Sequence, residues 1–376
     1  MSDRTKVKRD ASPLAGTDGA TSGAPASKRA VLPQYLEAKY LERLPKAEMY
    51  ERSYMHRDTV EHVVATASGF VITISADGHV KFWKKNAQGI EFVKDFRAHL
   101  SAIVAHSLSP DGQLFATTSA DKMVKVFDVL SFDMIGIVSV DCVPSAMCWV
   151  RDQLDRSTCI AVADSESSTV SIFDYRASAE PKYTITDVHR LPVVLMAYSA
   201  VYECIISVDK GGMIEYWSAN DPHKLPPTVE FSLKSQTDLY EFKRSKCVPN
   251  SLVLSSDSEL FSCTSLDDST IRVFRVSTGK LYRKHSESIS ASNAIQHGDE
   301  GGKFRLDDME FGRRLAVENE LLKSAAGRLS NAVFDDSGHF LLFASLAGIK
   351  VLNLAANKVV RVLGMSEPYR FINIAL

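Results

Sequence analysis

Histidine, aspartate, hydroxyl and tryptophan side chains recur together along the sequence, and the most complete set begins at His56. Its other members are Asp77, Trp83 and a hydroxyl from Ser75 or, alternatively, Thr73. An imidazole can bond a carboxylate through one ring nitrogen and a hydroxyl through the other, and that hydroxyl can also accept from an indole N–H. A buried chain of this kind stabilises one geometry, because unpaired polar groups inside a protein are costly. We therefore interpret it as a structural network.

The same pattern returns in two later segments. It is formed by His99 and Asp121 in the first, and by His189, Asp209 and Trp217 in the second. In the first of these, Phe127 stands where the tryptophan would be and has no donor. We expect structural roles here too, rather than catalysis or metal binding.

Motifs of catalysis or of a resident ligand are absent from the sequence. The phosphate-loop, dinucleotide, nucleophile-elbow and zinc-protease patterns do not occur. Ser277 to Lys280 matches only a fragment of a phosphate loop, and the ten histidines lack metal-ligand spacing. We expect no catalytic residue, no cofactor and no metal in this chain.

The composition is that of a soluble globular protein, with 45% hydrophobic and 24% charged residues in 376. A net charge of −2 argues against a bulk electrostatic grip on nucleic acid or on an anionic membrane, and leaves a local basic patch open. No apolar run approaches the ~20 residues that span a bilayer. The six cysteines show no CxxC pairing and lie beside apolar segments, so we expect reduced and mostly buried thiols. They are Cys142, Cys148, Cys159, Cys204, Cys247 and Cys263.

Short apolar runs separated by turns repeat along most of the chain. From His56 to His99 there are four β-type runs, which describe one blade of a WD40 propeller. The last large residues of the third strands are at 83, 127, 173, 217, 274 and 352, at intervals of 44, 46, 44, 57 and 78. The predicted fold is all-β: a WD40 β-propeller of the seven-bladed type, with six complete blades, an incomplete seventh and one inserted helix.

The two long intervals predict departures from the repeat. The 57-residue interval implies a longer connection within 218–247, where three prolines break regular structure. The 78-residue interval implies an insertion at about 285–325. Its polar first half, residues 285–302, is expected as a loop, and residues 309–322 are expected as an amphipathic helix.

Two adjacent arginines on this predicted helix, Arg313 and Arg314, are candidate contacts for a partner. They would suit a phosphate, although a solvated helix face is the alternative.

The termini are expected to differ from the repeats. Residues 1–32 contain few large apolar side chains and are predicted to be a disordered tail. Residues 33–48 form a lead-in with a short helix over 35–44, which Pro45 should stop. The propeller then covers 49–376.

The end of the predicted propeller is incomplete. Residues 367–376 are expected as the first strand of a seventh blade, and residues 49–55 could supply its outer, closing strand. An open ring has exposed strand edges, so we expect the natural protein to be longer than this chain.

Segments outside the repeat pattern resemble one family, that of peptidylprolyl isomerase domain and WD repeat-containing proteins. The resemblance runs from about residue 41 to 376 and includes loops and the inserted helix. It is carried by residues 49–58, 77–85, 89–94, 212–217, 237–242, 308–314 and 348–351.

This resemblance implies nuclear proteins associated with spliceosomes, in which a cyclophilin-type isomerase domain follows the propeller. The expected partners are proteins of a nuclear RNA–protein assembly, with direct RNA contact weakly supported and no membrane contact. A nuclear location is expected, with a cytoplasmic one as the alternative. No cyclophilin active-site motif occurs here, so no catalytic residue carries over. The expected function is an interaction scaffold; the alternative is prolyl isomerisation by a domain outside this chain.

Overall fold

The computed structural model describes most of the chain. The described residues are 34–46, 55–152, 157–176, 180–219, 225–298 and 304–376. The predicted disordered tail, and all but Met55 of the predicted closing strand 49–55, lie outside them.

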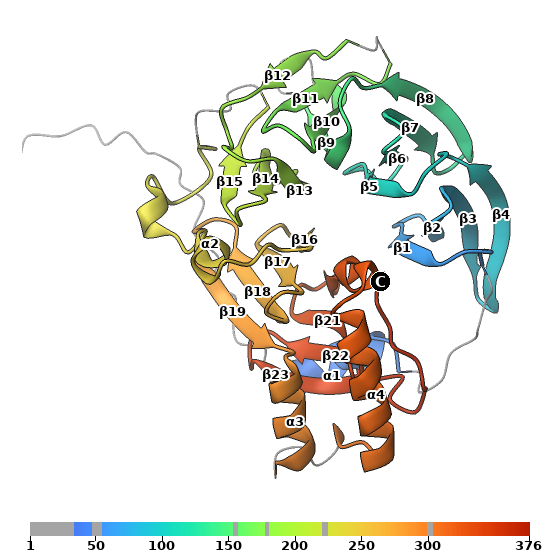
Figure 1. Cartoon of the computed structure of the whole chain (residues 1–376), viewed down its shortest axis with the longest axis vertical. Helices are drawn as coiled ribbons and strands as arrows, with labels where there is room; N and C mark the ends of the chain where they lie inside the picture. The colour runs from blue at the N-terminus through green and yellow to red at the C-terminus, as the bar shows by residue number, and fades with distance from the viewer. Residues whose placement is uncertain (1–33, 47–54, 153–156, 177–179, 220–224, 299–303) are drawn as a thin grey trace, which may run out of the picture. The chain divides into compact units, whose positions relative to one another are not determined.

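Six antiparallel sheets follow one another around a common centre within the compact unit Val31–Leu376 (Figure 1). We call them blades 1 to 6 in chain order. Blade 1 contains β1 (Val60–Ala65), β2 (Phe70–Ser75), β3 (His79–Asn86) and β4 (Gly89–Arg97). Blade 2 contains β5 (Ile103–Leu108), β6 (Leu114–Ser119), β7 (Met123–Asp128) and β8 (Asp133–Ser139). Blade 3 contains β9 (Pro144–Arg151), β10 (Thr158–Asp164), β11 (Val170–Phe173) and β12 (Tyr183–Ile185).

The second half of the ring is built the same way. Blade 4 contains β13 (Val193–Ser199), β14 (Cys204–Asp209) and β15 (Ile214–Trp217). Blade 5 contains β16 (Ser251–Leu254), β17 (Leu260–Ser265), β18 (Thr270–Arg275) and β19 (Leu281–Ser286). Blade 6 contains β20 (Ala332–Phe334), β21 (Phe340–Ser345), β22 (Gly348–Asn353) and β23 (Lys358–Leu363). Six blades were predicted, and six are present.

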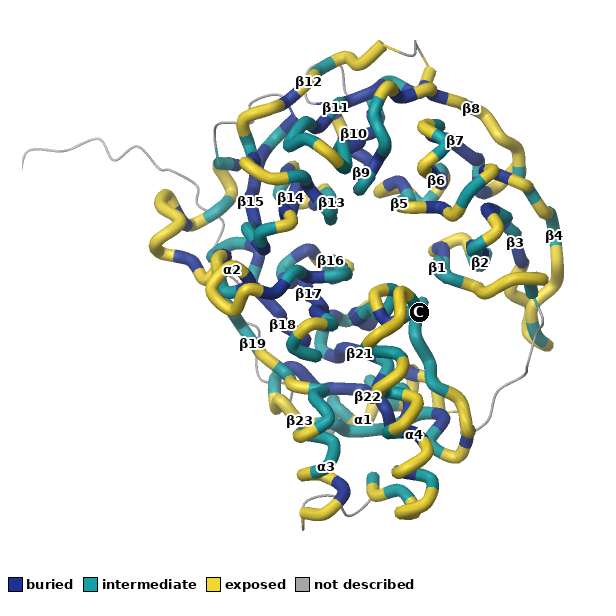
Figure 2. Tube along the Cα trace, viewed as in Figure 1, coloured by how far each residue is buried: buried dark blue, intermediate teal, exposed yellow. Residues whose placement is uncertain are grey.

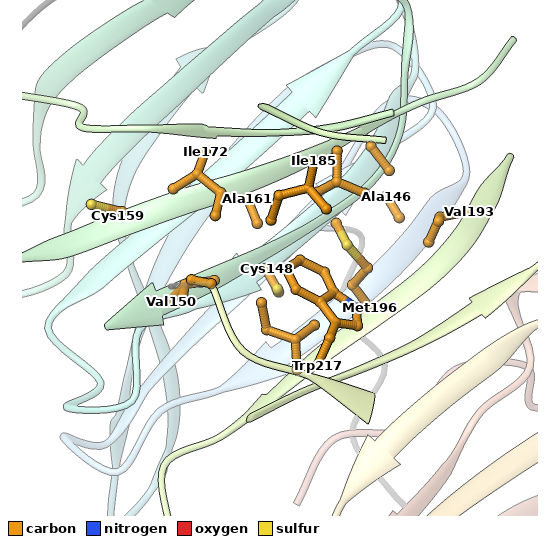
Figure 3. Packing of buried hydrophobic residues seen from close by; sticks show 14 residues of the cluster. Ala146, Cys148, Val150, Cys159, Ala161, Ile172, Ile185, Val193, Met196 and Trp217 are labelled. Atoms are coloured by element: carbon orange, nitrogen blue, oxygen red, sulfur yellow. The ribbon is translucent and has the colours of Figure 1, made fainter. Parts of the chain in front are cut away.

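The core consists of apolar layers between neighbouring blades, where the strands appear as buried in Figure 2. Alternating side chains of a strand point to opposite faces, so Ile72 and Phe82 of blade 1 pack against Phe115 and Phe127 of blade 2. Between blades 3 and 4, the buried Trp217 lies beside Cys148, with Ala161 in the same layer (Figure 3). Middle strands such as β14 and β17 are therefore buried on both faces, whereas the innermost strand β1 is half-buried.

Blade 4 differs from the prediction of six complete blades, because the described residues give it three strands. Where a fourth strand would follow, the chain forms a 3₁₀ helix, η1 (Lys234–Gln236), and a short helix, α2 (Glu241–Ser245). The irregular segment predicted within 218–247 is found here, and it replaces the strand.

The insertion before blade 6 holds more helix than predicted. The helix expected over 309–322 is α4 (Asp308–Leu321), and a 3₁₀ helix, η3 (Ala325–Leu329), follows it. The part predicted as a loop contains α3 (Ile289–His297), which begins where the Ser288 hydroxyl accepts from the Ala291 N–H at 3.3 Å. That serine cap satisfies an open N–H of the first turn, and it allows a polar sequence to be helical. The prediction of a single inserted helix is therefore wrong.

The N-terminal helix α1 (Gln34–Arg43) packs on blade 6. Leu44, just after it, lies against Phe340, Leu342 and Val351, which face away from blade 5. The Asn353 side chain also donates to the Glu37 carboxylate at 2.9 Å. The lead-in helix thus covers the face of blade 6 where a further blade would pack.

The predicted first strand of a seventh blade, residues 367–376, is not a strand in the structure. Side chains take part in the bonds that hold it: the Asn331 side chain pairs with the backbone of Ile374, and Arg370 pairs with Glu318. Apolar residues made the segment look like a strand, but these contacts hold it in an irregular conformation.

Candidate interaction surface and its supporting networks

In blade 4, the three side chains named from the sequence, His189, Asp209 and Trp217, are joined in one network by a fourth, Ser207, which was not predicted from the sequence. His189 Nε2 lies 2.6 Å from the Ser207 hydroxyl, and Trp217 Nε1 donates to the same hydroxyl at 2.8 Å. His189 Nδ1 lies 3.4 Å from the Asp209 carboxylate. Burial alone would raise the pKa of Asp209, but hydrogen bonds from His189 and from backbone N–H groups hold it below its usual value.

The network of blade 1 uses Thr73 rather than Ser75. The Thr73 hydroxyl lies 2.7 Å from His56 Nε2 and accepts from Trp83 Nε1 at 2.8 Å. In the β2–β3 ladder, Val71 is directly opposite Trp83, so Thr73 is the diagonal neighbour of the indole. Ser75 lies two residues further along β2, beyond the reach of the indole N–H. Ser75 is buried, and its hydroxyl has no hydrogen-bond partner among the described residues.

The expected link from His56 to Asp77 is not formed. His56 Nδ1 is buried and has no hydrogen-bond partner in the described part of the chain, while Asp77 accepts from the backbone N–H of His79 at 3.3 Å. Burial, aided by the nearby Lys81, lowers the pKa of His56. Blade 1 is therefore a three-member chain and not the most complete network, which is that of blade 4.

In blade 2, His99 is bonded at both ring nitrogens. Nδ1 lies 2.9 Å from the Asp121 carboxylate, and Nε2 lies 2.9 Å from the Thr117 hydroxyl. Phe127 is fully buried in the apolar layer against blade 1, and its side chain has no group that could take part in the network.

Two further networks, in blades 5 and 6, were missed by sequence reasoning. Arg272 is fully buried; it donates to Thr270 at 2.6 Å and to Asp268, and its guanidinium stacks on Phe242. In blade 6, Lys350 donates to both oxygens of Glu287 at 2.8 Å, and His285 lies 2.7 Å from the same carboxylate.

A signal for these two networks was present. A charged residue recurs two positions before the last large residue of the third strand, in Lys81, Lys125, Glu215, Arg272 and Lys350. A charged side chain that recurs between buried residues indicates an ion pair with an oppositely charged partner, because an unpaired buried charge is strongly unfavourable.

The two arginines proposed as partner contacts are separated by the structure. Arg314 is 8% exposed and donates to four backbone carbonyls, those of Leu346, Ala347, Met365 and Glu367. Arg314 therefore links blade 6 to the C-terminal segment inside the protein. The prediction that it contacts a partner is wrong. Arg313 is exposed and pairs with Glu310 at 3.1 Å.

A cavity of about 540 Å³ lies beside blade 4. One wall is the connection before β13, with Arg190 and Leu191; the turn before β15 contributes Met213; and the segment after β15 contributes Lys234 and Lys243. Glu215 is buried beneath it and pairs with Lys234. The sequence pattern does not predict this cavity, because its lining comes from segments far apart in the chain, residues 187–191, 209–215 and 234–243.

The connections that follow the network histidines carry exposed apolar side chains. Leu100, after His99, is 80% exposed, and Leu191, two residues after His189, is 46% exposed. The networks hold these connections in place from inside, and large exposed apolar groups on fixed loops are typical of protein-interaction surfaces.

The described residues include six cysteines and no cluster of three metal ligands. No group of three His, Cys, Asp or Glu side chains in the described part of the chain is placed to hold a metal. All six cysteines are free thiols, and burial raises the pKa of Cys148 and of Cys204 to about 12, which disfavours the reactive thiolate. Among the described helices, none has the length and apolar character needed to cross a bilayer.

The sheets and their networks define a WD40 β-propeller. Residues 90–128 match the family described as WD domain, G-beta repeat. The β-propeller domain of Cps50 (Swd1) from Myceliophteria thermophila superposes with a TM-score of 0.58 over 88% of this chain and 92% of that one, at 13% identity, which shows the fold.

The chain is a relative of the peptidylprolyl isomerase domain and WD repeat-containing proteins, which confirms the resemblance found in the sequence. It is 45% identical over 94% of its length to peptidyl-prolyl cis-trans isomerase cyp15 of Rhizopus delemar, covering 56% of that protein. It is 44% identical over 93% of its length to peptidylprolyl isomerase domain and WD repeat-containing protein 1 of Homo sapiens, covering 53%. Peptidyl-prolyl cis-trans isomerase CYP71 of Arabidopsis thaliana is 43% identical over 94% of the chain. The chain thus spans about half the length of these relatives.

Proposed function

We propose that this propeller is a scaffold that docks proteins of a nuclear, spliceosomal RNA–protein assembly. The observation that carries the scaffold role is the pair of exposed side chains, Leu100 and Leu191, on connections anchored by buried histidine networks. A rigid ring with such loops offers broad surfaces to partners. The spliceosomal and nuclear assignment rests on the family resemblance.

Affinity capture from nuclear extract, followed by mass spectrometry, tests this proposal. We expect splicing proteins to be recovered with the wild-type chain and to be reduced with the Leu100→Asp/Leu191→Asp variant. An exposed pair on outer strands, Ile90→Asp/Ile137→Asp, is the matched control. Recovery of no splicing protein would contradict the assembly, and equal recovery by both variants would contradict the loops as the contact.

A second proposal concerns the whole protein, because its relatives are named peptidyl-prolyl cis-trans isomerases. We propose that any isomerase activity is carried by a part other than this propeller. A proline-isomerisation assay on this chain should show background rates only, and a clear rate enhancement would overturn the proposal.

A third proposal is direct RNA binding through basic side chains on the loops. Binding of a single-stranded oligonucleotide that weakens steeply as salt rises would support it. Absent binding, or binding independent of salt, would remove it.

A further inference from the structure

Two histidines outside the polar networks meet where blades 1 and 2 pack together. His62 lies on β1 and His106 on β5, the strands of these blades nearest the centre of the ring (Figure 1). In their ladders they are opposite Ile74 and Thr117, whose side chains share their strand face. Their ring centres lie 4.5 Å apart, with the ring planes tilted by 52°. Two imidazoles from separate blades are thus held in direct contact.

Neither imidazole uses its nitrogens within the described part of the chain. His62 and His106 make no hydrogen bond or ion pair with another described residue. Among the described histidines, only His56 has a buried ring nitrogen without a partner, so the nitrogens of His62 and His106 reach solvent. Burial lowers the pKa of His62 to about 4 and that of His106 to about 3, where the nearby His62 ring adds to the effect. Both rings are therefore neutral near pH 7, the state in which an imidazole nitrogen binds a metal.

The backbone next to each histidine is fixed by a bond from a distant part of the chain. The N–H of Val63, beside His62, donates to the Asn373 side chain at 3.2 Å. The carbonyl of Ser107, beside His106, accepts from Trp149 Nε1 at 3.0 Å. Ligands that are held in place in advance lose little freedom when an ion binds, so this support favours a site at the pair.

The separation of the rings selects among coordination geometries. A metal lies about 2.0–2.1 Å from an imidazole nitrogen and so about 3.2 Å from the ring centre. Ring centres 4.5 Å apart then make an angle of about 90° at a shared ion, whereas a tetrahedral ion would need a separation of about 5.2 Å. Either nitrogen of each ring can turn toward the ion, because the outer torsion of histidine is broad and roughly two-fold. An angle near 90° suits the square-planar or tetragonal sites of Cu²⁺ and Ni²⁺.

We propose that His62 and His106 together bind one divalent copper or nickel ion, with water as its other ligands. No third His, Cys, Asp or Glu of the described chain is placed to join them. Glu61 precedes His62 and points to the opposite face of β1. The histidines lack metal-ligand spacing along the sequence, but a pair from two blades needs no local spacing. The ion links blade 1 to blade 2, and its binding is independent of the scaffold role proposed above.

Equilibrium titration of the untagged chain with Cu²⁺ at pH 7.5 tests the proposal. We expect one ion per chain, and at least about tenfold weaker binding by His62→Gln/His106→Gln, because the ion then loses both nitrogen ligands. The matched control is His79→Gln/His297→Gln, which removes two other histidines, on β3 and α3, and should bind like the wild type. Melting curves check that each variant folds.

Two measurements on the wild type do not depend on any variant. Electron paramagnetic resonance of the bound Cu²⁺ should show coupling to two imidazole nitrogens. Binding should also persist at pH 5.5, because the pKa values of about 4 and about 3 leave few protons to compete, whereas histidines with the ordinary pKa of about 6.5 would release the ion. The proposal is overturned by no binding at one equivalent, coupling to a single nitrogen, loss of the ion by pH 5.5, or equal binding by the two double variants.

Discussion

The side-chain amide of Asn331 exchanges two hydrogen bonds with the backbone of Ile374: its Nδ2 donates to the carbonyl oxygen at 2.8 Å, and its Oδ1 accepts from the N–H at 2.9 Å. One side chain thus supplies the pair of bonds that a neighbouring strand would make. Next to it, the Asn373 side chain donates to the Leu329 carbonyl and accepts from the Val63 N–H of β1. The C-terminal segment therefore ties the connection before blade 6 to blade 1.

Removing this amide should weaken that tie. We expect Asn331→Ala to lower the free energy of unfolding by about 1–3 kcal/mol, because two backbone groups of the buried Ile374 lose their partner. Urea denaturation measures the change. Asn319→Ala, on the exposed face of α4, is the control and should cost less than about 0.5 kcal/mol. Equal effects of the two substitutions would mean that the segment is held by other contacts.

The choice of Thr73 over Ser75 in blade 1 gives a paired test. Thr73→Val removes the hydroxyl shared by His56 and Trp83 and leaves two buried ring nitrogens unpaired, which should cost about 2–4 kcal/mol. Ser75→Ala removes a buried hydroxyl that has no partner in the described structure, so it should be neutral or slightly stabilising. Thermal unfolding separates the two, and a larger loss for Ser75→Ala would reverse the assignment.

Much of the fold follows from periodicity, because each blade repeats apolar alternation and turns at nearly constant spacing. The identity of the network hydroxyl does not follow, since Thr73 and Ser75 are two apart and face the same way. Arg313 and Arg314 look equivalent in the sequence, but adjacent residues of a helix point in different directions. The Arg313 side chain is exposed, whereas the Arg314 side chain is buried. The irregular end and the cavity depend on contacts far apart in the chain, which local patterns do not encode.

Arg272 in blade 5 should be among the residues most sensitive to substitution. Arg272→Ala leaves the Asp268 carboxylate without its counter-ion and removes packing on Phe242, so we expect a loss of about 3–5 kcal/mol. Arg244→Ala is the control, because its side chain is 82% exposed in a surface pair and should contribute less than about 1 kcal/mol. Chemical denaturation checks both, and a loss below about 1 kcal/mol at Arg272 would contradict the buried network.

The paired imidazoles of His62 and His106 predict a loss of stability in acid. Their rings lie 4.5 Å apart where blades 1 and 2 meet, and burial lowers the pKa of His62 to about 4 and that of His106 to about 3. Below pH 6.5 the unfolded chain binds protons that the folded protein does not, so stability falls as pH falls. His62 alone should lower the free energy of unfolding by about 3 kcal/mol between pH 6.5 and pH 4.

Replacing both rings tests this pH dependence. His62→Gln/His106→Gln should show a smaller drop in melting temperature between pH 7.5 and pH 5 than the wild type. His297→Gln, on α3, is the control, and its drop should match that of the wild type. An unchanged drop in the double variant would show that other groups set the acid sensitivity.

The outer strand of blade 2 should limit solubility. The outer strands β4, β19 and β23 contain lysine or arginine, which discourage pairing with another chain, whereas β8 contains neither. Ile135 and Ile137 on β8 are 46% and 50% exposed. Ile137→Lys should therefore reduce aggregation during heating while leaving the free energy of unfolding within about 0.5 kcal/mol. Light scattering measures this, and the control is Ile90→Lys on β4, where Glu91 and Lys94 already supply charge. Equal improvement by both variants would show that added charge, and not the β8 edge, controls association.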